Sequence, residues 1–333
     1  MSQPADEDWD GHTDPVPLAE GACCVPARRP LGASVVRDAR QVAPPQGRHA
    51  VEQVELDGGR FLMGDSYGDG NPLDGERPLH GVDLEAFNID VTTVTNDAFA
   101  LFAEETGYRT DAEVFGYSAV FHLAVEAAQS EDIGPAAGTP WWRGVRGASW
   151  RRPGGLRSDN DGWGDHPVVH VSWNDAMAYC AWSGRHLPTE AQWEYAARGG
   201  LVAARYPWGD ELMDDGSWQV NIFQGEFPSR NSADDGWMTT APVRTFAPNA
   251  FGLWQTVGNV WEWCSDWYDP SYYSRSPRRE PQGPDAGSGR VLRGGSYLCH
   301  DSYCNRYRTS ARSSNTTDSS MGNAGFRTVG RPG

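Results

Sequence analysis

Glycine and proline interrupt this sequence so often that it can form few long helices or strands. The 333 residues include 39 Gly and 23 Pro, together with 15 Trp. Gly and Pro favour turns, and Trp buries a large ring in a small core. The sequence therefore predicts short elements joined by loops, packed around large aromatic side chains. Its length allows one large domain or two ordinary ones.

The first 48 residues differ from the rest of the chain. They are rich in Pro, Ala, Asp and Arg and have no hydrophobic periodicity, so we expect residues 1–48 to be a flexible tail. Cys23 and Cys24 are adjacent within it. The acidic start has no apolar core typical of a signal peptide, and no stretch is long and apolar enough to span a membrane. We therefore expect a cytoplasmic protein.

The folded part is expected to begin at His49. The stretch VEQVELDGGRFLMGD predicts a β-hairpin that turns at Gly58-Gly59. The next segment predicts a strand and then a helix, capped by Thr95 or Asn96. Phe99, Phe102 and Ala103 share one face of that helix. Residues 106–167 have little regular signal, although Trp141, Trp142, Trp150 and Trp163 argue that they are ordered.

Two further helices are predicted in the middle of the chain. A short strand over His166–Ser172 precedes a helix from Asn174 to Trp182, which Gly184 ends. Thr189 begins the second helix with a capping box to Gln192, and Gly199-Gly200 end it. From Tyr206 onward we expect short strands and loops.

One loop holds two of the six cysteines. In GGSYLCHDSYCNRYR, Cys299 and Cys304 are separated by four residues. Two thiols at this spacing can form a disulfide, half of a zinc site, or a two-coordinate site for a soft metal. Zinc requires four ligands, and no second pair is nearby in the sequence. Cu(I) prefers thiolates and can be held by two. Spacing alone favours a disulfide or unpaired thiols and leaves the alternatives open.

The net charge of −17 argues against a nucleic-acid partner, which requires a basic surface. An acidic surface mildly favours cations, but most of these charges are typical of a solvated surface.

Several motifs occur in a fixed order along the chain: HVSWNDAMAYCAWSGRHLPTEAQWEYAARGG, YPWGD, VGNVWEW, RGGSY and GFR. Together they resemble the formylglycine-generating enzyme (sulfatase-modifying factor) family of prokaryotic aerobic type, from about Gly58 to Thr328. The resemblance implies an α+β fold, the family's variant of the C-type-lectin-like fold, with little regular secondary structure. It also implies a single domain over residues 49–330.

The resemblance further implies a function. The chain would be a copper-dependent oxidase that uses O2 to convert a cysteine in a C-x-P-x-R-type motif of an unfolded sulfatase polypeptide to Cα-formylglycine. Cu(I) would be bound by Cys299 and Cys304. Ser296 would donate a hydrogen bond near the oxygen or the substrate sulfur, and Trp261 would form a wall of the pocket. The substrate groove would be lined by Tyr303, His300, Ser320 and Asn323. We expect a monomer.

The resemblance also implies two Ca²⁺ sites, and a hard cation of this kind prefers oxygen ligands. The first would use the side chains of Asn221 and Asp235 with the carbonyls of Ile222 and Trp237. The second would use Gln255 and Glu262 with the carbonyls of Gly258 and Val260. An alternative interpretation of Glu262 is a buried acid paired with an arginine.

Other functions remain alternatives. The strongest is a non-catalytic peptide- or ligand-binding module on the same fold, which needs no thiol pair. A thiol–disulfide redox protein would usually show a C-x-x-C motif in a βαβ pattern, which is absent from the sequence. Cys180 and Cys264 are expected to be unpaired buried side chains. The residue that receives the substrate arginine is not identified.

Overall fold

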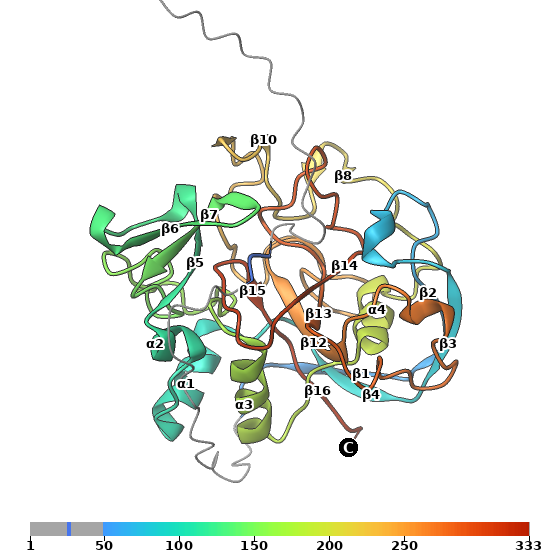
Figure 1. Cartoon of the computed structure of the whole chain (residues 1–333). Helices are drawn as coiled ribbons and strands as arrows, with labels where there is room; N and C mark the ends of the chain where they lie inside the picture. Colours follow the sequence, from blue (N-terminus) through green and yellow to red (C-terminus); the bar gives the residue numbers. More distant parts are fainter. Residues whose placement is uncertain (1–24, 28–48, 333) are drawn as a thin grey trace, which may run out of the picture.

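The computed structural model describes residues 25–27 and 49–332. In this part of the chain, short elements surround a four-stranded sheet (Figure 1). The strands are β1 Gln53–Leu56, β2 Gly59–Met63, β3 His80–Leu84, β4 Phe87–Asp90, β5 Tyr117–Phe121, β6 Asp132–Ala136, β7 Thr139–Arg146, β8 Met213–Asp214, β9 Ser217–Trp218, β10 Gly225–Glu226, β11 Arg230–Asn231, β12 Trp261–Trp267, β13 Arg290–Arg293, β14 Arg312–Asn315, β15 Ala324–Gly325 and β16 Val329–Gly330. The helices are α1 Asn96–Thr106, α2 Asp111–Phe115, α3 Trp173–Ser183 and α4 Glu190–Arg198.

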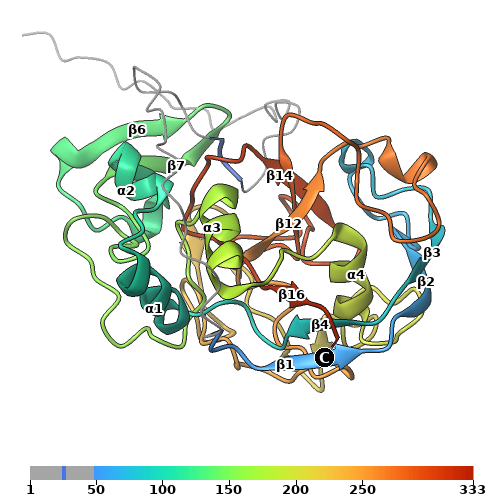
Figure 2. The same cartoon turned by 90° about the horizontal axis from the view of Figure 1, so that it is seen from below.

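The central sheet has the order β14-β13-β12-β15. Strand β12 pairs antiparallel with β13 and parallel with β15. A second sheet, β1-β4-β16, brings the end of the chain beside its first strands. A third, β5-β7-β6, lies to one side of the molecule with α1 and α2 (Figure 2). Helix α4 contacts β12 and β13 as well as β2 and β3, so it joins two sheets.

The predicted helices are confirmed together with their caps. The Thr95 side chain accepts from the Ala98 amide at the start of α1, and Gly184 ends α3 in the left-handed conformation. At α4, Thr189 and Gln192 form the predicted capping box. Each cap forms between residues within one turn of the helix, so a short stretch of sequence is enough to predict it.

Three predictions of strands were wrong or incomplete. Strands β1 and β2 flank Gly58 but pair with β4 and β3, so the hairpin at Gly58-Gly59 is not formed. Residues 166–172 form no strand, because Val168 and His170 bond to separate loops. Residues 106–167 contain α2 and the three-stranded sheet, which sequence periodicity did not reveal. In each case pairing between distant segments decides the structure.

The core is built from aromatic rings, as the tryptophan content predicted. Phe99 and Phe102 of α1 pack against Tyr179 and Trp182 of α3. The ring centroids lie 6.1 Å apart in Phe99–Tyr179, 5.6 Å in Phe102–Tyr179 and 5.5 Å in Phe102–Trp182. Within α1, the rings of Phe99 and Phe102 are 5.3 Å apart. Such edge and offset contacts stabilise beyond the area they bury. Helices α1 and α3 are thereby held against each other beside the central sheet.

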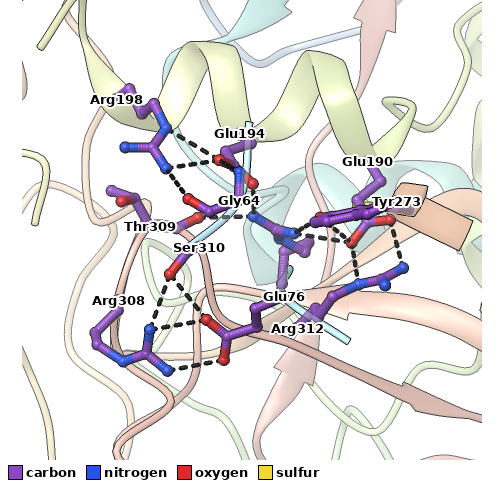
Figure 3. A network of polar contacts seen from close by, with 12 residues as sticks. Gly64, Glu76, Glu190, Glu194, Arg198, Tyr273, Arg308, Thr309, Ser310 and Arg312 are labelled. Carbon is purple, nitrogen blue, oxygen red and sulfur yellow. Dashed lines mark hydrogen bonds and ion pairs between the residues drawn. The ribbon is translucent and has the colours of Figure 1, made fainter. Parts of the chain in front are cut away.

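A network of buried ion pairs holds the segment that contains the cysteine pair (Figure 3). Before that segment, Arg293 donates to Glu190 at 2.8 Å and Glu194 at 2.5 Å. After it, Arg308 forms two 2.8 Å bonds with Glu76. These side chains are at most 2% exposed. Because an unpaired buried charge is costly, the partners fix both ends of the segment.

Further arginines extend the network. Arg312 of β14 donates to both carboxylate oxygens of Glu190, and Arg198 of α4 donates to Glu194. Burial alone would raise the pKa of Glu194, but Arg198 and Arg293 together lower it below its ordinary value. Glu194 is therefore ionised at neutral pH.

Part of the predicted flexible tail is packed against the domain. Val25 is 5% exposed and belongs to the main apolar core. The Pro26 carbonyl accepts from Asn315 Nδ2 at 3.0 Å. These residues differ from the prediction for 1–48, of which 1–24 and 28–48, including Cys23 and Cys24, lie outside the described residues.

None of the helices within 25–27 and 49–332 combines the length and apolar character that a membrane crossing requires.

Candidate active site

The two cysteines of the candidate site lie in the loop that connects β13 to β14. Gly295, at the start of this loop, has a φ of +72°, and a Cβ there would lie 2.4 Å from the Arg306 carbonyl oxygen. Only glycine permits this close approach without displacing the backbone. The Gly-Gly pair of the motif therefore folds the start of the loop back against its end.

Cys299 is completely buried and points back to Ser296. The Ser296 amide lies 3.4 Å from the Cys299 sulfur, and the Cys299 amide donates to the Ser296 carbonyl at 2.9 Å. An N–H directed at a sulfur stabilises a thiolate. Asn323 Nδ2 donates to the Ser296 hydroxyl at 2.9 Å, which orients that side chain. The structure thus brings together three of the predicted residues, Cys299, Ser296 and Asn323.

Cys304 is half-buried and follows a turn that begins at His300. The Cys304 amide donates to the His300 carbonyl at 2.9 Å, and the His300 ring bonds the Ser302 hydroxyl at 2.7 Å. His300 therefore holds the turn between the two cysteines. Cys299 and Cys304 are not joined in a disulfide, so the disulfide alternative does not describe this structure.

An aromatic cluster lies beside Cys304. Tyr303 stacks on Phe227 with ring centroids 4.5 Å apart and meets Trp141 edge-on at 4.9 Å. We name this cluster the aromatic wall; its members are Phe121, Trp141, Phe223, Phe227 and Tyr303. Trp141 therefore lies beside one of the residues predicted to line the groove, Tyr303. Trp150, by contrast, is 2% exposed and packs on Phe99.

Ser320 is connected to two residues that sequence reasoning missed. Its hydroxyl bonds the Ser118 hydroxyl at 2.8 Å, and Ser118 bonds His170 Nδ1 at 2.8 Å. Burial lowers the pKa of His170 to about 4, so its ring is neutral at pH 7. The motif HVSW contains His170, but nothing in its spacing connects it to Ser118 of β5.

Trp261 is fully buried at the start of β12. Its backbone amide donates to the Asn323 carbonyl at 2.8 Å, which fixes the position of Asn323 relative to the central sheet. Its role as a wall of the pocket stays a prediction.

The other described cysteines lie outside this loop, Cys180 in α3 and Cys264 in β12. Cys180 and Cys264 are free and buried, as expected. Burial raises the pKa of both thiols, so they remain protonated.

The residues of the first predicted calcium site lie together. Asp235 accepts from the amides of Ile222 at 3.1 Å and Trp237 at 2.9 Å. Asn221 uses its Nδ2 on the Thr239 carbonyl, while its buried Oδ1 has no hydrogen-bond partner among the described residues. A buried oxygen without a donor is costly unless a cation meets it. These oxygens are of the type that Ca²⁺ prefers, and a cation there would replace the Gln224 Nε2 group that now donates to the Ile222 carbonyl and to Asp235.

The second set fits a cation less well. Both oxygens of Glu262 bind Arg327, at 2.6 and 2.8 Å, and Trp193 Nε1 donates to one of them. The Gln255 Oε1 atom is buried without a partner among the described residues, but the carboxylate is already neutralised by a guanidinium. Gly258 packs on the Asn221 carbonyl, and Val260 is buried in the same turn. The geometry agrees with the alternative of an acid paired with an arginine.

Comparison with known proteins decides the family. The profile described as the sulfatase-modifying factor enzyme 1-like domain matches residues 39–332. The chain belongs to this family. The match begins ten residues before His49, where we had placed the start of the domain, within residues that the structure does not describe.

Relatives within the family are close. A formylglycine-generating enzyme of Streptomyces coelicolor is 64% identical over 83% of this chain and 88% of its own length. The inactive Cα-formylglycine-generating enzyme 2 of Mus musculus is 44% identical over 84% of this chain and 86% of its own length. PvdO from Pseudomonas aeruginosa shares the fold, with a TM-score of 0.62 at 23% identity over 85% of this chain and 95% of PvdO. The expected α+β fold is confirmed.

Proposed function

We propose that this chain is a formylglycine-generating enzyme, an oxidase that converts a sulfatase cysteine to Cα-formylglycine. The identity of 64% to an enzyme of that name supports this function over most of the chain. The observation that carries it within the structure is the buried thiol of Cys299, which faces the Ser296 amide in a loop shared with Cys304.

Cu(I) is the cofactor that fits this loop. Within residues 25–27 and 49–332, no three His, Cys, Asp or Glu side chains gather as a metal site, so a zinc site built on the pair has no further ligands there. Two thiolates suit a soft monovalent ion, and Cys299 and Cys304 would hold it. When bound, copper would supply the redox chemistry with O2.

The protein's own residues position the reactants. The Ser296 amide lies 3.4 Å from the Cys299 sulfur and would stabilise a thiolate there, and Asn323 Nδ2 donates to the Ser296 hydroxyl. The burial of Cys299 excludes water, which strengthens these electrostatic contacts. Tyr303 in the aromatic wall, with Ser320 and His300, would line the groove that receives the substrate.

The overall reaction balances with one O2 and a thiol reductant. The substrate Cβ–S bond breaks and a C=O bond forms, so the CH2SH group becomes CHO and releases H2S. This oxidation removes two electrons, whereas reduction of O2 to water requires four. Two further electrons and two protons must come from an external thiol pair, which becomes a disulfide.

The substrate would be an unfolded sulfatase segment of C-x-P-x-R type. A cysteine packed inside a folded sulfatase could not approach a buried thiol, whereas an extended peptide binds through its backbone and alternate side chains. We infer that the protein is cytoplasmic, which the free thiols of Cys180 and Cys264 support, and that it is a monomer. Ca²⁺ at Asn221 and Asp235 would stabilise the fold.

A short peptide tests this function. The enzyme is loaded with Cu(I) without air and then given O2, a thiol reductant and a peptide that carries Cys-x-Pro-x-Arg. Mass spectrometry should find the aldehyde, and a peptide with Ser in place of Cys should stay unchanged, because serine offers no soft ligand. Exchange of Pro or Arg should weaken turnover less. If the enzyme converted only a folded sulfatase and left the peptide unchanged, the proposal that an extended peptide binds in the groove would be contradicted.

A non-catalytic peptide-binding module is the second candidate. The 44% identity to a relative named inactive shows that sequence likeness at that level does not guarantee activity. This alternative predicts peptide binding without copper and without need of Cys299 or Cys304. Peptide binding that persists in a Cys299→Ser variant, with no turnover in the parent enzyme, would favour it.

A further inference from the structure

The N-terminal part of this chain contains the five-residue pattern that we propose for the substrate. Residues 24–28, Cys-Val-Pro-Ala-Arg, read C-x-P-x-R, and Cys24 is the only one of the six cysteines followed by proline at the second position and arginine at the fourth. Cys24 and Arg28 lie outside the described residues. Val25, Pro26 and Ala27 are described, so the structure shows where the middle of the pattern lies.

This middle portion is seated in the domain. Val25 and Pro26 are buried, and Val25 is part of the same apolar core as Cys299. The Pro26 carbonyl accepts a hydrogen bond from Asn315 Nδ2 at 3.0 Å. Both views place the short blue segment between the β5–β7 sheet and β14 (Figures 1 and 2). A buried apolar side chain together with a backbone hydrogen bond is how extended peptides are bound.

Hydrogen bonds and neighbouring positions in the sequence connect this seat with the buried thiol. The Asn315 amide that holds Pro26 also lies 3.9 Å from the Met321 sulfur. Met321 is next to Ser320 and two residues before Asn323, both predicted to line the groove. Asn323 bonds Ser296, whose amide faces Cys299. Cys24 is joined to Val25 by one peptide bond, about 3.8 Å between Cα atoms.

We propose that residues 24–28 are an internal substrate of this enzyme and that Cys24 is itself oxidised to formylglycine. The inference rests on the proposed function and uses the same balance: the Cβ–S bond of Cys24 breaks, a C=O bond forms, and O2 with an external thiol pair supplies the remaining atoms and electrons. A tethered substrate acts at an effective concentration near the millimolar range, so a weak motif suffices.

The test uses the full-length chain. It is purified without air or copper, then given Cu(I), O2 and a thiol reductant. Peptide mass spectrometry and an aldehyde-reactive hydroxylamine probe should both locate an aldehyde at residue 24. The neighbouring Cys23→Ser variant is the matched control and should still acquire the aldehyde, whereas Cys24→Ser should not. The first-order rate should be independent of protein concentration. Equal modification of a Cys299→Ser chain mixed with wild type would overturn the intramolecular reaction.

A second variant separates an internal substrate from a tail that merely packs on the domain. Val25→Asp places a charge in the apolar seat and should slow conversion of Cys24. It should also lower KM for an added peptide several-fold at unchanged kcat, because the competitor has left the groove. An unchanged KM would overturn the occupancy of the groove by this segment.

The two measurements also distinguish failure of the internal-substrate proposal from failure of the proposed function. If the added peptide is converted while Cys24 keeps its thiol, the internal substrate is refuted and the proposed function stands. If neither thiol is converted by the copper-loaded enzyme, the proposed function itself fails.

Discussion

Arg308 and Glu76 form a bidentate ion pair in the interior, 232 residues apart in the sequence, with both N–O distances at 2.8 Å. Each side chain is at most 2% exposed. Arg308 lies four residues after Cys304, so this pair anchors the end of the cysteine loop to the loop between β2 and β3. Planar guanidinium and carboxylate groups match in this geometry, which makes the contact directional as well as strong.

Removal of one partner should therefore destabilise the fold. Glu76→Ala leaves the Arg308 charge buried and uncompensated, and we expect the free energy of unfolding to fall by about 3–5 kcal/mol. Urea denaturation measures the loss. Glu226→Ala is the control, because its pair with Arg230 is exposed on both sides and should contribute less than about 1 kcal/mol. Equal effects of the two substitutions would contradict this account.

The four described cysteines should divide into two classes. Cys299→Ser and Cys304→Ser should each abolish formylglycine formation with the fold intact, because two thiolates are the minimum for a stable Cu(I) site. Cys180→Ala and Cys264→Ala should keep most activity, because these residues lie in α3 and β12 and not in the loop between β13 and β14. Copper content and peptide conversion are measured for each variant. Full activity in Cys299→Ser or in Cys304→Ser would contradict a Cu(I) site built from these two thiolates.

Asn323 should act as a positioning residue. Asn323→Ala removes the donor that holds the Ser296 hydroxyl, and loss of such a supporting contact typically costs about 10–100-fold in metal affinity or activity. We expect a decrease of that order in kcat for the peptide, with an unchanged melting temperature. Asn88→Ala, which removes an exposed side-chain contact with the Arg331 carbonyl at 3.2 Å, is the control.

Calcium removal should lower thermal stability more than it changes the chemistry. A cation bound only by the folded state stabilises it by about 2.7 kcal/mol when its concentration is 100 times Kd. Chelation should lower Tm in the wild type and have little effect in Asp235→Ala. Asp234→Ala, at the neighbouring position, should respond as the wild type does. An unchanged Tm, with no calcium found by metal analysis, would refute the site.

His170 should make stability depend on pH. Burial lowers its pKa from 6.5 to about 4 in the folded protein. The unfolded chain therefore binds a proton more readily, so the contribution is fully present above pH 6.5 and is lost as the pH falls toward 4. At about 1.4 kcal/mol per pKa unit, the change is roughly 3 kcal/mol. The wild type should lose stability more steeply across this range than His170→Gln; parallel curves would contradict it.

Local signals explain which parts of the fold could be predicted from the sequence. Thr95, Thr189 and Gly184 act within one turn of their own helices, so a short stretch of sequence is enough to predict their roles. Strand β1 pairs with β4 instead of β2, and β4 pairs in turn with β16, more than two hundred residues away; no local pattern contains that information.

The residues of the candidate site also fall into those that the sequence could predict and those that it could not. Cys299, Ser296 and Asn323 could be named because the motif resembles a known family, and the structure brings them together. Ser118 and His170 could not, since a serine in a strand and a histidine after an apolar run are common in any protein. Only the tertiary contact between β5 and the loop before β15 makes them neighbours of Ser320.

The long sequence separation of the buried ion pairs has a consequence for biosynthesis. Glu76 is synthesised early and Arg308 near the end, and Asp90 receives the Thr328 amide, 238 residues later. A nascent chain therefore holds its acidic partners without their arginines until almost the whole polypeptide has left the ribosome. The cysteine loop acquires its anchors only then, and a premature stop anywhere before Arg308 leaves the loop unanchored.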